Sequence, residues 1–214
     1  MSNLDLWPQL DQYAGYVQLP HPLTIFEETR DPWPIGVAII LSAHCTDAAV
    51  NHATPGFLRN FPAPDSVVGK VRDDLIPWLP RISHRGLKSD YLLNWARYLV
   101  ERKGDIEPSI AALTCIKGIG RKTASLILYR VKGIEEGFPL DTHALRVLDR
   151  LAWLPETKNP SVREKQLLKI VPEGQRHRLH LILTHHGRQV CHAQMPSCDS
   201  CKLRTVCNLA RAQT

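Results

Sequence analysis

The sequence predicts an all-α protein, and three observations support this prediction. Apolar residues recur at helical spacing through most of the 214 residues, as in the run from Leu92 through Trp95 to Leu99. Neither an Asn-Gly nor an Asp-Gly pair marks a β-hairpin, and no long alternation of apolar and polar residues marks a strand. Sixteen prolines stand between the periodic segments, where they are expected to end helices.

The expected helices follow one another along the chain. Pro34 and the apolar spacing after it predict a single helix over residues 34–50. Ser109 is the expected N-cap of a helix over residues 110–116. Apolar spacing alone predicts four further helices, over residues 88–103, 123–131, 142–151 and 178–187.

The charge is positive and unevenly distributed. The net charge is +6 and the pI is about 9.1. Residues 157–214 carry ten Lys or Arg against three Asp or Glu, and residues 116–134 carry five Lys or Arg and no acid. A clustered positive field attracts polyanions, most often nucleic acid, although a solvated basic surface that binds nothing is an equal alternative.

Membrane and secreted classes are not favoured. The sequence contains no apolar run of 18 residues, so no membrane span is expected. The first residues show no basic stretch followed by an apolar one, so no secretory signal is expected. A reducing interior, in which clustered cysteines bind metal more often than they form disulfides, is the predicted environment.

Four of the six cysteines stand close together near the C-terminus, in the pattern C-x6-C-x2-C-x5-C. Thiolates at short, fixed intervals can converge around a cation, so the pattern predicts a metal or iron–sulfur loop. The spacing alone does not decide between zinc and iron–sulfur. The four predicted ligands are Cys191, Cys198, Cys201 and Cys207. Cys45 and Cys115 lie in apolar helical contexts and are expected to be small core residues.

A second pattern occupies residues 113–127, where apolar residues stand on both sides of a Gly-Ile-Gly turn. It predicts two short helices joined by a tight hairpin. The N–H groups at the start of the second helix can bind phosphate, helped by the helix dipole. This helix-hairpin-helix pattern indicates a grip on the DNA backbone without sequence readout, with an ordinary packing corner as the alternative. The predicted contacts are Gly118, Ile119, Gly120 and Arg121.

Two residues are candidates for chemistry. Lys122 falls in the first turn of the second hairpin helix, where the positive end of the dipole disfavours an ammonium and so favours a nucleophilic amine. By local physics alone, a contact from Lys122 to phosphate is the favoured role. Asp141 is expected to cap the helix that starts at Thr142, and its carboxylate can also stabilise positive charge on a reacting sugar.

These motifs resemble those of the endonuclease III family of DNA repair glycosylases, which belongs to the helix-hairpin-helix superfamily with a catalytic aspartate. Four stretches carry the resemblance in the family's order, and together they span nearly the whole chain from residue 21 to residue 207. They are residues 41–47, residues 117–124, residues 140–143 and the cysteine loop.

The resemblance implies a bifunctional enzyme of base excision repair. Lys122 matches the Schiff-base lysine, Asp141 the catalytic aspartate, and the four cysteines the ligands of a 4Fe–4S cluster. The implied activity is removal of oxidised pyrimidines by a DNA N-glycosylase, with β-elimination at abasic sites. A monofunctional adenine or mismatch glycosylase and a DNA-binding module with weakened catalysis are the alternatives.

The resemblance also implies an architecture and a partner. A six-helix barrel with the hairpin is expected over residues 24–136. An iron–sulfur cluster lobe is expected from residues 1–23 and 137–214, with a DNA-binding cleft between the lobes. The implied partner is double-stranded DNA with damaged bases or abasic sites. The protein is expected to be a cytoplasmic, nucleoid-associated monomer of bacterial type.

Several residues depart from the family pattern or add to it. His44 stands where the family usually has Gln, a residue that fills the gap left by a flipped base. His84 stands where an apolar wedge is expected, although another alignment gives this role to Leu87. Imidazoles at these two positions change the stacking, or are mere surface groups. Within the cysteine loop, Lys202 and Arg204 are further candidates for contacts to the DNA backbone.

Overall fold

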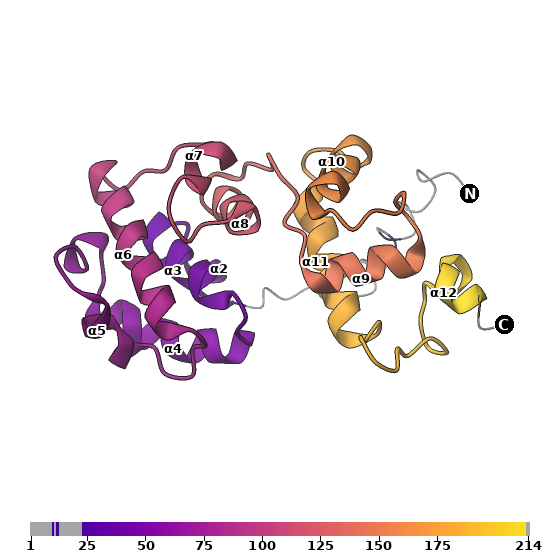
Figure 1. Ribbon diagram of the computed structural model, residues 1–214, viewed down its shortest axis with the longest axis horizontal. Helices are drawn as coiled ribbons and strands as arrows, with labels where there is room; N and C mark the ends of the chain where they lie inside the picture. Colours follow the sequence, from indigo (N-terminus) through magenta and orange to yellow (C-terminus); the bar gives the residue numbers. More distant parts are fainter. Residues whose placement is uncertain (1–9, 11, 13–22, 213–214) are drawn as a thin grey trace. The chain divides into compact units, whose positions relative to one another are not determined.

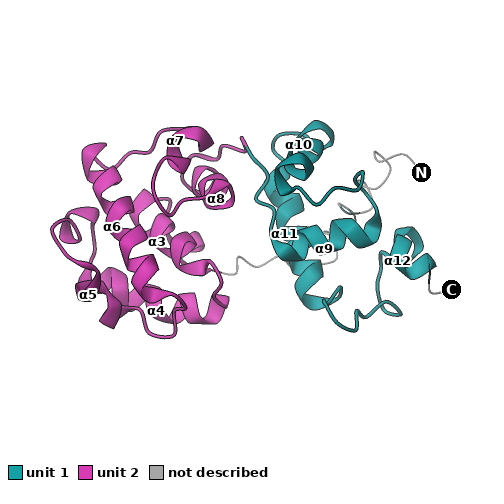
Figure 2. Cartoon of the chain, viewed as in Figure 1, with its two compact units in different colours: residues 1–20, 137–214 teal, residues 21–136 magenta. Residues whose placement is uncertain are grey.

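The computed structural model describes Leu10, Gln12 and residues 23–212, and every regular element among them is helical (Figure 1). The predicted all-α class is therefore confirmed. The chain divides into two compact units: unit 2 consists of residues 21–136, and unit 1 consists of residues 1–20 with 137–214 (Figure 2). Among the described helices, none combines the length and apolar character that a membrane crossing needs.

The unit of residues 21–136 is built around one buried helix, α3. Eight of the eleven residues of α3 are buried, so it is apolar on all sides and lies at the centre of the core. It packs against α4, α6 and α8. The helices of this unit are α2 (Ile25–Glu28), α3 (Pro32–Ser42), α4 (Asp47–Asn60), α5 (Arg72–Leu75), α6 (Arg85–Glu101), α7 (Ile110–Thr114) and α8 (Arg121–Lys132), with 3-10 turns η1 (Pro64–Ser66) and η2 (Ile76–Trp78).

The single helix expected over residues 34–50 is wrong. The chain leaves α3 after Ser42, and α4 starts at Asp47. Between them His44 has a φ of 53°, which no right-handed helix contains. Thr46 then caps α4, because its side-chain oxygen accepts the N–H of Ala49 at 3.2 Å.

The start of α7 lies where the sequence places it, after Ser109. The Ser109 side chain makes no capping bond, however. The Ile110 N–H donates instead to the Glu136 carboxylate at 2.7 Å. A residue from the end of this unit thus accepts from an N–H group that the first turn of the helix leaves without an acceptor. The helix is also shorter than predicted, since it ends at Thr114.

Unit 1 has its own core. Helices α9 and α11 pack closely against each other, and Leu203 and Cys207 of the cysteine loop join their apolar cluster. Helix α10 was not predicted, although Asn159 caps it by accepting the Ser161 N–H at 3.0 Å and Pro160 starts it. The helices are α9 (Thr142–Leu151), α10 (Pro160–Ile170), α11 (Arg176–Gln189) and α12 (Asn208–Arg211), with the 3-10 turn η3 (Arg204–Val206).

Candidate active site and metal centre

The Gly-Ile-Gly turn between α7 and α8 depends on its first glycine. Gly118 has a φ of +103°, and a Cβ added there would lie 2.2 Å from the ring of Tyr91 on α6. Only glycine fits this position without displacing Tyr91. Ile119 is 3% exposed, and its N–H donates to the Ile116 carbonyl at 3.0 Å. Ile119 thus anchors the turn from inside.

The second hairpin helix presents a positive end to solvent. Gly120 occupies the N-cap position of α8, and a Cβ there would meet no atom within 4 Å. Arg121 and Lys122 follow with exposed side chains, and the first turn holds no acid. Helix geometry leaves the first N–H groups without intrahelical acceptors, so this end of α8 can bind an anion.

The predicted N-cap role of Asp141 is confirmed. One carboxylate oxygen, Oδ1, accepts the Ala144 N–H of α9 at 2.8 Å. The other, Oδ2, accepts a hydrogen bond from the Thr184 hydroxyl of α11 at 3.2 Å. The side chain is partly exposed, so the carboxylate is fixed in direction and still reachable. Asp141 belongs to unit 1, whereas Lys122 belongs to unit 2.

His44 and His84 lie together at the tips of two loops of unit 2. Both are exposed, and their ring centroids are 6.2 Å apart. The Ser83 hydroxyl donates to the His44 carbonyl at 2.7 Å and so joins the two loops. Leu87, the other candidate wedge, is 48% exposed in the first turn of α6.

The buried side chain of Lys88 supports these two loops, a role that nothing in the sequence indicated. Its side chain is 4% exposed, and its Nζ donates to the carbonyls of Leu41 at 2.8 Å and Ala43 at 2.5 Å. These carbonyls lie at the C-terminal end of α3, where a cation also complements the helix dipole. The ammonium thus fixes the point at which the chain turns toward His44.

The two cysteines outside the loop have different environments. Cys115 is exposed at the end of α7, so the prediction of a core residue is wrong there. Cys45 is partly buried, with its Sγ 3.1 Å from the Ser83 hydroxyl and 3.2 Å from Lys88 Nζ. Burial raises the pKa of Cys45, but hydrogen bonds from the Ser83 backbone N–H, at 3.2 Å, and from Lys88 outweigh it and hold the pKa below that of an ordinary thiol.

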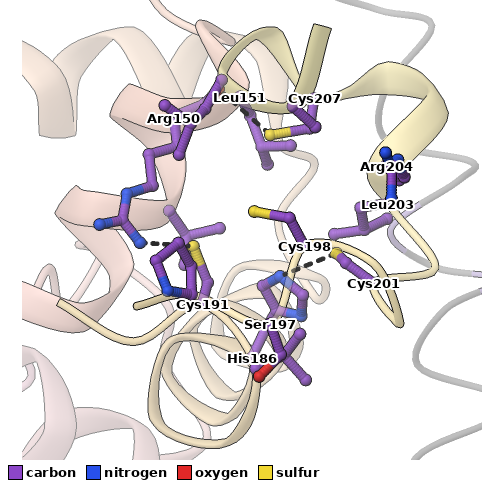
Figure 3. A pocket seen from close by; sticks show the side chains of 15 residues that line it. Arg150, Leu151, His186, Cys191, Ser197, Cys198, Cys201, Leu203, Arg204 and Cys207 are labelled. Carbon is purple, nitrogen blue, oxygen red and sulfur yellow. Dashed lines mark hydrogen bonds between the residues drawn. The ribbon is translucent and has the colours of Figure 1, made fainter. Parts of the chain in front are cut away.

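The four cysteines of the C-terminal loop line one cavity (Figure 3). None of them is in a disulfide. Within the described residues, no three His, Cys, Asp or Glu side chains are close enough to hold a single metal ion. The sulfur atoms therefore surround a space rather than meet at a point. Apolar residues of α9, α12 and the loop form much of the remaining wall, including Val147, Leu151, Leu203, Leu209 and Ala210.

Arg150 connects α9 to the beginning of this loop. Its guanidinium donates to Cys191 Sγ at 3.2 Å, to the His192 carbonyl at 2.6 Å and to the Ala193 carbonyl at 2.9 Å. On the other side of the cavity, His186 Nε2 lies 3.8 Å from Cys201 Sγ. Two of the four sulfurs are thus contacted by nitrogen atoms of the surrounding helices.

The other two predicted contacts, Lys202 and Arg204, are exposed on the same loop. Arg204 forms an ion pair with Asp199 at 2.5 Å, within the loop itself. Both residues lie on the surface of the loop, and Arg204 also borders the cavity.

Comparisons with known proteins agree with this geometry. Residues 37–173 match the HhH-GPD superfamily of base excision DNA repair proteins. The chain belongs to this superfamily. Endonuclease III of Escherichia coli K12 is 32% identical, over 88% of each chain. Endonuclease III of Synechocystis sp. is 31% identical, over 86% of this chain and 84% of that protein.

These relatives place the chain in the endonuclease III family of this superfamily, and solved structures agree. A trapped endonuclease III–DNA covalent intermediate has a TM-score of 0.89 and 26% identity, over 100% of this chain and 99% of the other. A non-covalent endonuclease III–DNA complex has a TM-score of 0.88 and the same identity. The protein is therefore a DNA glycosylase of base excision repair, as its motifs predicted.

Proposed function

We propose that the chain is a bifunctional DNA N-glycosylase that removes oxidised pyrimidines and cleaves the resulting abasic site by β-elimination. One observation carries the proposal. Lys122 is an exposed amine in the first turn of α8, directly after the Gly-Ile-Gly turn. An amine beside an anion-binding helix end is placed to reach the sugar of a nucleotide whose phosphate that end holds.

In the proposed reaction the damaged nucleotide is first flipped out of the duplex, because its C1′ cannot be attacked within the stack. The neutral Lys122 amine forms a bond to C1′, and the bond from C1′ to the base breaks with its electron pair leaving on the base. The amine then loses one proton, and the C1′–O4′ bond breaks with its electron pair and a proton going to O4′, which leaves a protonated Schiff base between Lys122 and C1′. Removal of a C2′ proton then expels the 3′ phosphate.

Asp141 is proposed to act on the charge of that sugar. Its carboxylate is held by the N–H of Ala144 and by the hydroxyl of Thr184, so it presents a fixed negative charge. Such a charge stabilises the positive charge that develops at C1′ as the base departs. It can also accept the proton that the amine must lose.

The proposed partner is double-stranded DNA with a damaged base or an abasic site, bound by a monomer. Phosphate contacts are assigned to Gly118, Gly120 and Arg121, and to the loop residues Lys202 and Arg204. The exposed positive end of α8 supports the first group. Such contacts position the duplex without reading its sequence, so lesion choice depends on other residues, for which His44 and His84 are proposed.

The proposed cofactor is a 4Fe–4S cluster held by Cys191, Cys198, Cys201 and Cys207. One zinc ion would draw four thiolates to within about 3.8 Å of one another, given zinc–sulfur bonds of about 2.3 Å. The four free thiols instead border a partly apolar cavity, which suits a larger cluster. When bound, the cluster supplies a cross-link between the loop and the core of unit 1.

Borohydride trapping on an abasic-site duplex tests the lyase. The wild-type protein should form a covalent adduct, because borohydride reduces the Schiff base. Lys122→Ala should form none, while the control Lys70→Ala, an exposed lysine of the same unit, should trap normally. Adduct formation by Lys122→Ala would remove Lys122 as the nucleophile. Release of the base without strand cleavage would indicate a monofunctional glycosylase instead.

A duplex panel tests the substrate class. Thymine glycol and dihydrouracil should be excised, whereas uracil and adenine opposite 8-oxoguanine should not. Salt-sensitive DNA binding without any product would indicate a DNA-binding module that lacks catalysis.

A further inference from the structure

The carboxylate of Asp141 is held from a second helix as well as from its own. Oδ1 caps α9, and Oδ2 accepts the Thr184 hydroxyl at 3.2 Å. Thr184 is 8% exposed on α11. The two helices come close here, because a Cβ added at Gly187 would lie 2.9 Å from the His143 side chain. A residue far along the sequence therefore fixes the second oxygen.

The hydrogen bonding continues behind Thr184. A threonine hydroxyl has one proton, and a carboxylate can only accept, so the Thr184 proton points to Asp141. His180, one helical turn earlier, has its Nδ1 3.4 Å from the same hydroxyl. Its Nδ1 must then be the donor, which gives a directed chain from His180 through Thr184 to Asp141.

His180 is itself locked in place. It is 6% exposed, and its ring packs edge-on against Phe138 at 6.4 Å between centroids. The ring of His177 lies 5.9 Å away on the same helix. Phe138 in turn donates its N–H to the buried Glu164 of α10 at 3.3 Å. An imidazole enclosed in this way has little freedom to turn its Nδ1 away from Thr184.

The titratable residue His143, close to Asp141, does not take over the role of these hydrogen bonds. His143 follows Asp141 in α9 and interacts with its charge, but burial lowers the pKa of His143, with Arg188 and Arg146 adding to the effect. A lowered pKa leaves His143 neutral at neutral pH, so it brings no full positive charge to the carboxylate. Dipoles rather than an ion pair with His143 thus support the ionised form of Asp141.

We propose that Thr184 is a positioning residue for Asp141 and that His180 holds the Thr184 hydroxyl in its donating orientation. This inference rests on the proposed catalytic role of Asp141. The hydroxyl aims Oδ2 and favours the charged carboxylate, so that the group stays ionised while positive charge develops on the sugar. A hydrogen bond to a charged group is the strong kind, so its loss should be measurable in the rate.

The test replaces Thr184 by valine, which keeps the shape and removes the hydroxyl. Thr184→Val should lower the single-turnover excision rate roughly tenfold or more, with little change in KM for the damaged duplex. The acid limb of its pH–rate profile should move to higher pH, because a carboxylate without its donor is protonated more readily. Thr184→Ser, which restores the donor, should recover most of the rate and the profile.

A parallel Asp141→Asn variant distinguishes a failure of the role proposed for Asp141 from a failure of the role proposed for Thr184. If Asp141→Asn keeps full activity, the proposed function of Asp141 fails. If Asp141→Asn is inactive but Thr184→Val retains the wild-type rate and acid limb, only the role of Thr184 is overturned. Melting temperatures give a further check. A loss of rate that follows a loss of stability, and that serine does not rescue, would make Thr184 merely structural.

Discussion

The imidazole rings of His44 and His84 lie edge to face with their centroids 6.2 Å apart, although they come from separate loops of unit 2. Both residues have a positive φ, 53° and 52°, a conformation that is uncommon outside glycine. Both side chains are exposed, so the core does not require these rings. Backbone strain at exposed residues suggests a binding role rather than a folding role.

The first prediction concerns His84 as the residue that enters the duplex. His84→Ala should lower excision from a fully paired duplex about tenfold, because stacking of one base on a ring contributes about 1–3 kcal/mol. Excision from single-stranded substrate, which has no stack to open, should change much less. The measurement is single-turnover cleavage of matched substrates.

His52→Ala is the matched control for this prediction, since His52 is an exposed histidine on α4 of the same unit. Leu87→Ala decides between the two candidate wedges. If Leu87→Ala loses duplex activity and His84→Ala does not, the wedge is Leu87.

Lys88 provides the second prediction, on stability. Lys88→Met keeps the apolar stem but leaves the carbonyls of Leu41 and Ala43 without their donor. The free energy of unfolding should fall by about 2–3 kcal/mol, measured by urea denaturation. Lys88→Arg should recover part of this loss because it keeps a charged donor. An exposed control, Lys70→Met, should change little, and equal effects at both positions would contradict the argument.

The local part of the fold was predictable, and the long-range part was not. The helix expected over residues 142–151 coincides with α9, because its apolar period and its Asp141 cap are both local signals. The break around His44 depends on Lys88, which stands 47 positions after Leu41. No periodicity within residues 34–50 could indicate that contact.

The same distinction holds for the candidate site. The hairpin, the place of Lys122 in its second helix and the grouping of the four cysteines were visible in short segments, whereas the catalytic role expected of Lys122 and the iron–sulfur role expected of the cysteines came from the family resemblance. Thr184 was missed because its partner Asp141 is 43 residues away, and an isolated threonine in a helix carries no signal. Cys115 was misjudged because an apolar neighbourhood in sequence does not say which side of a short helix faces solvent.

The third prediction contrasts the two glycines of the hairpin. Gly118→Ala combines a positive φ with a clash against Tyr91, so it should destabilise the fold by about 2–5 kcal/mol. Gly120→Ala has a φ of −85° and open space around its Cβ, so the fold should tolerate it.

Gly120 should matter for DNA binding, although it does not matter for the stability of the fold. A methyl group at the positive end of α8 would stand where a phosphate must approach, so Gly120→Ala should weaken DNA binding about tenfold at an unchanged melting temperature. Fluorescence anisotropy on an abasic-site analogue measures this. Unchanged affinity would mean that the end of α8 does not hold the backbone.

Cys45 gives the fourth prediction, on pH dependence. Burial opposes the thiolate, but the hydrogen bonds from Ser83 and Lys88 and the Lys88 charge outweigh it, so the pKa of Cys45 lies below that of an ordinary thiol. Alkylation by iodoacetamide, followed at Cys45 by peptide mass spectrometry, should therefore have its midpoint at a lower pH than an ordinary cysteine. In Lys88→Met that midpoint should move up, because the variant removes both a donor and a positive charge that favour the thiolate. A midpoint that stays in place in Lys88→Met would contradict this assignment.

The fifth prediction concerns Arg150 and the retention of the proposed cluster. Its three donated bonds connect Cys191 and the two residues after it to α9. Arg150→Met removes both the charge and these bonds, so the absorbance near roughly 400 nm should fade several-fold faster under a chelator. Arg150→Lys should lie between, because an ammonium keeps the charge but cannot span three acceptors as a guanidinium does. Arg178→Met, an exposed site on α11, is the control. Equal fading in Arg150→Met and wild type would show that the loop holds its ligand through the four thiolates alone.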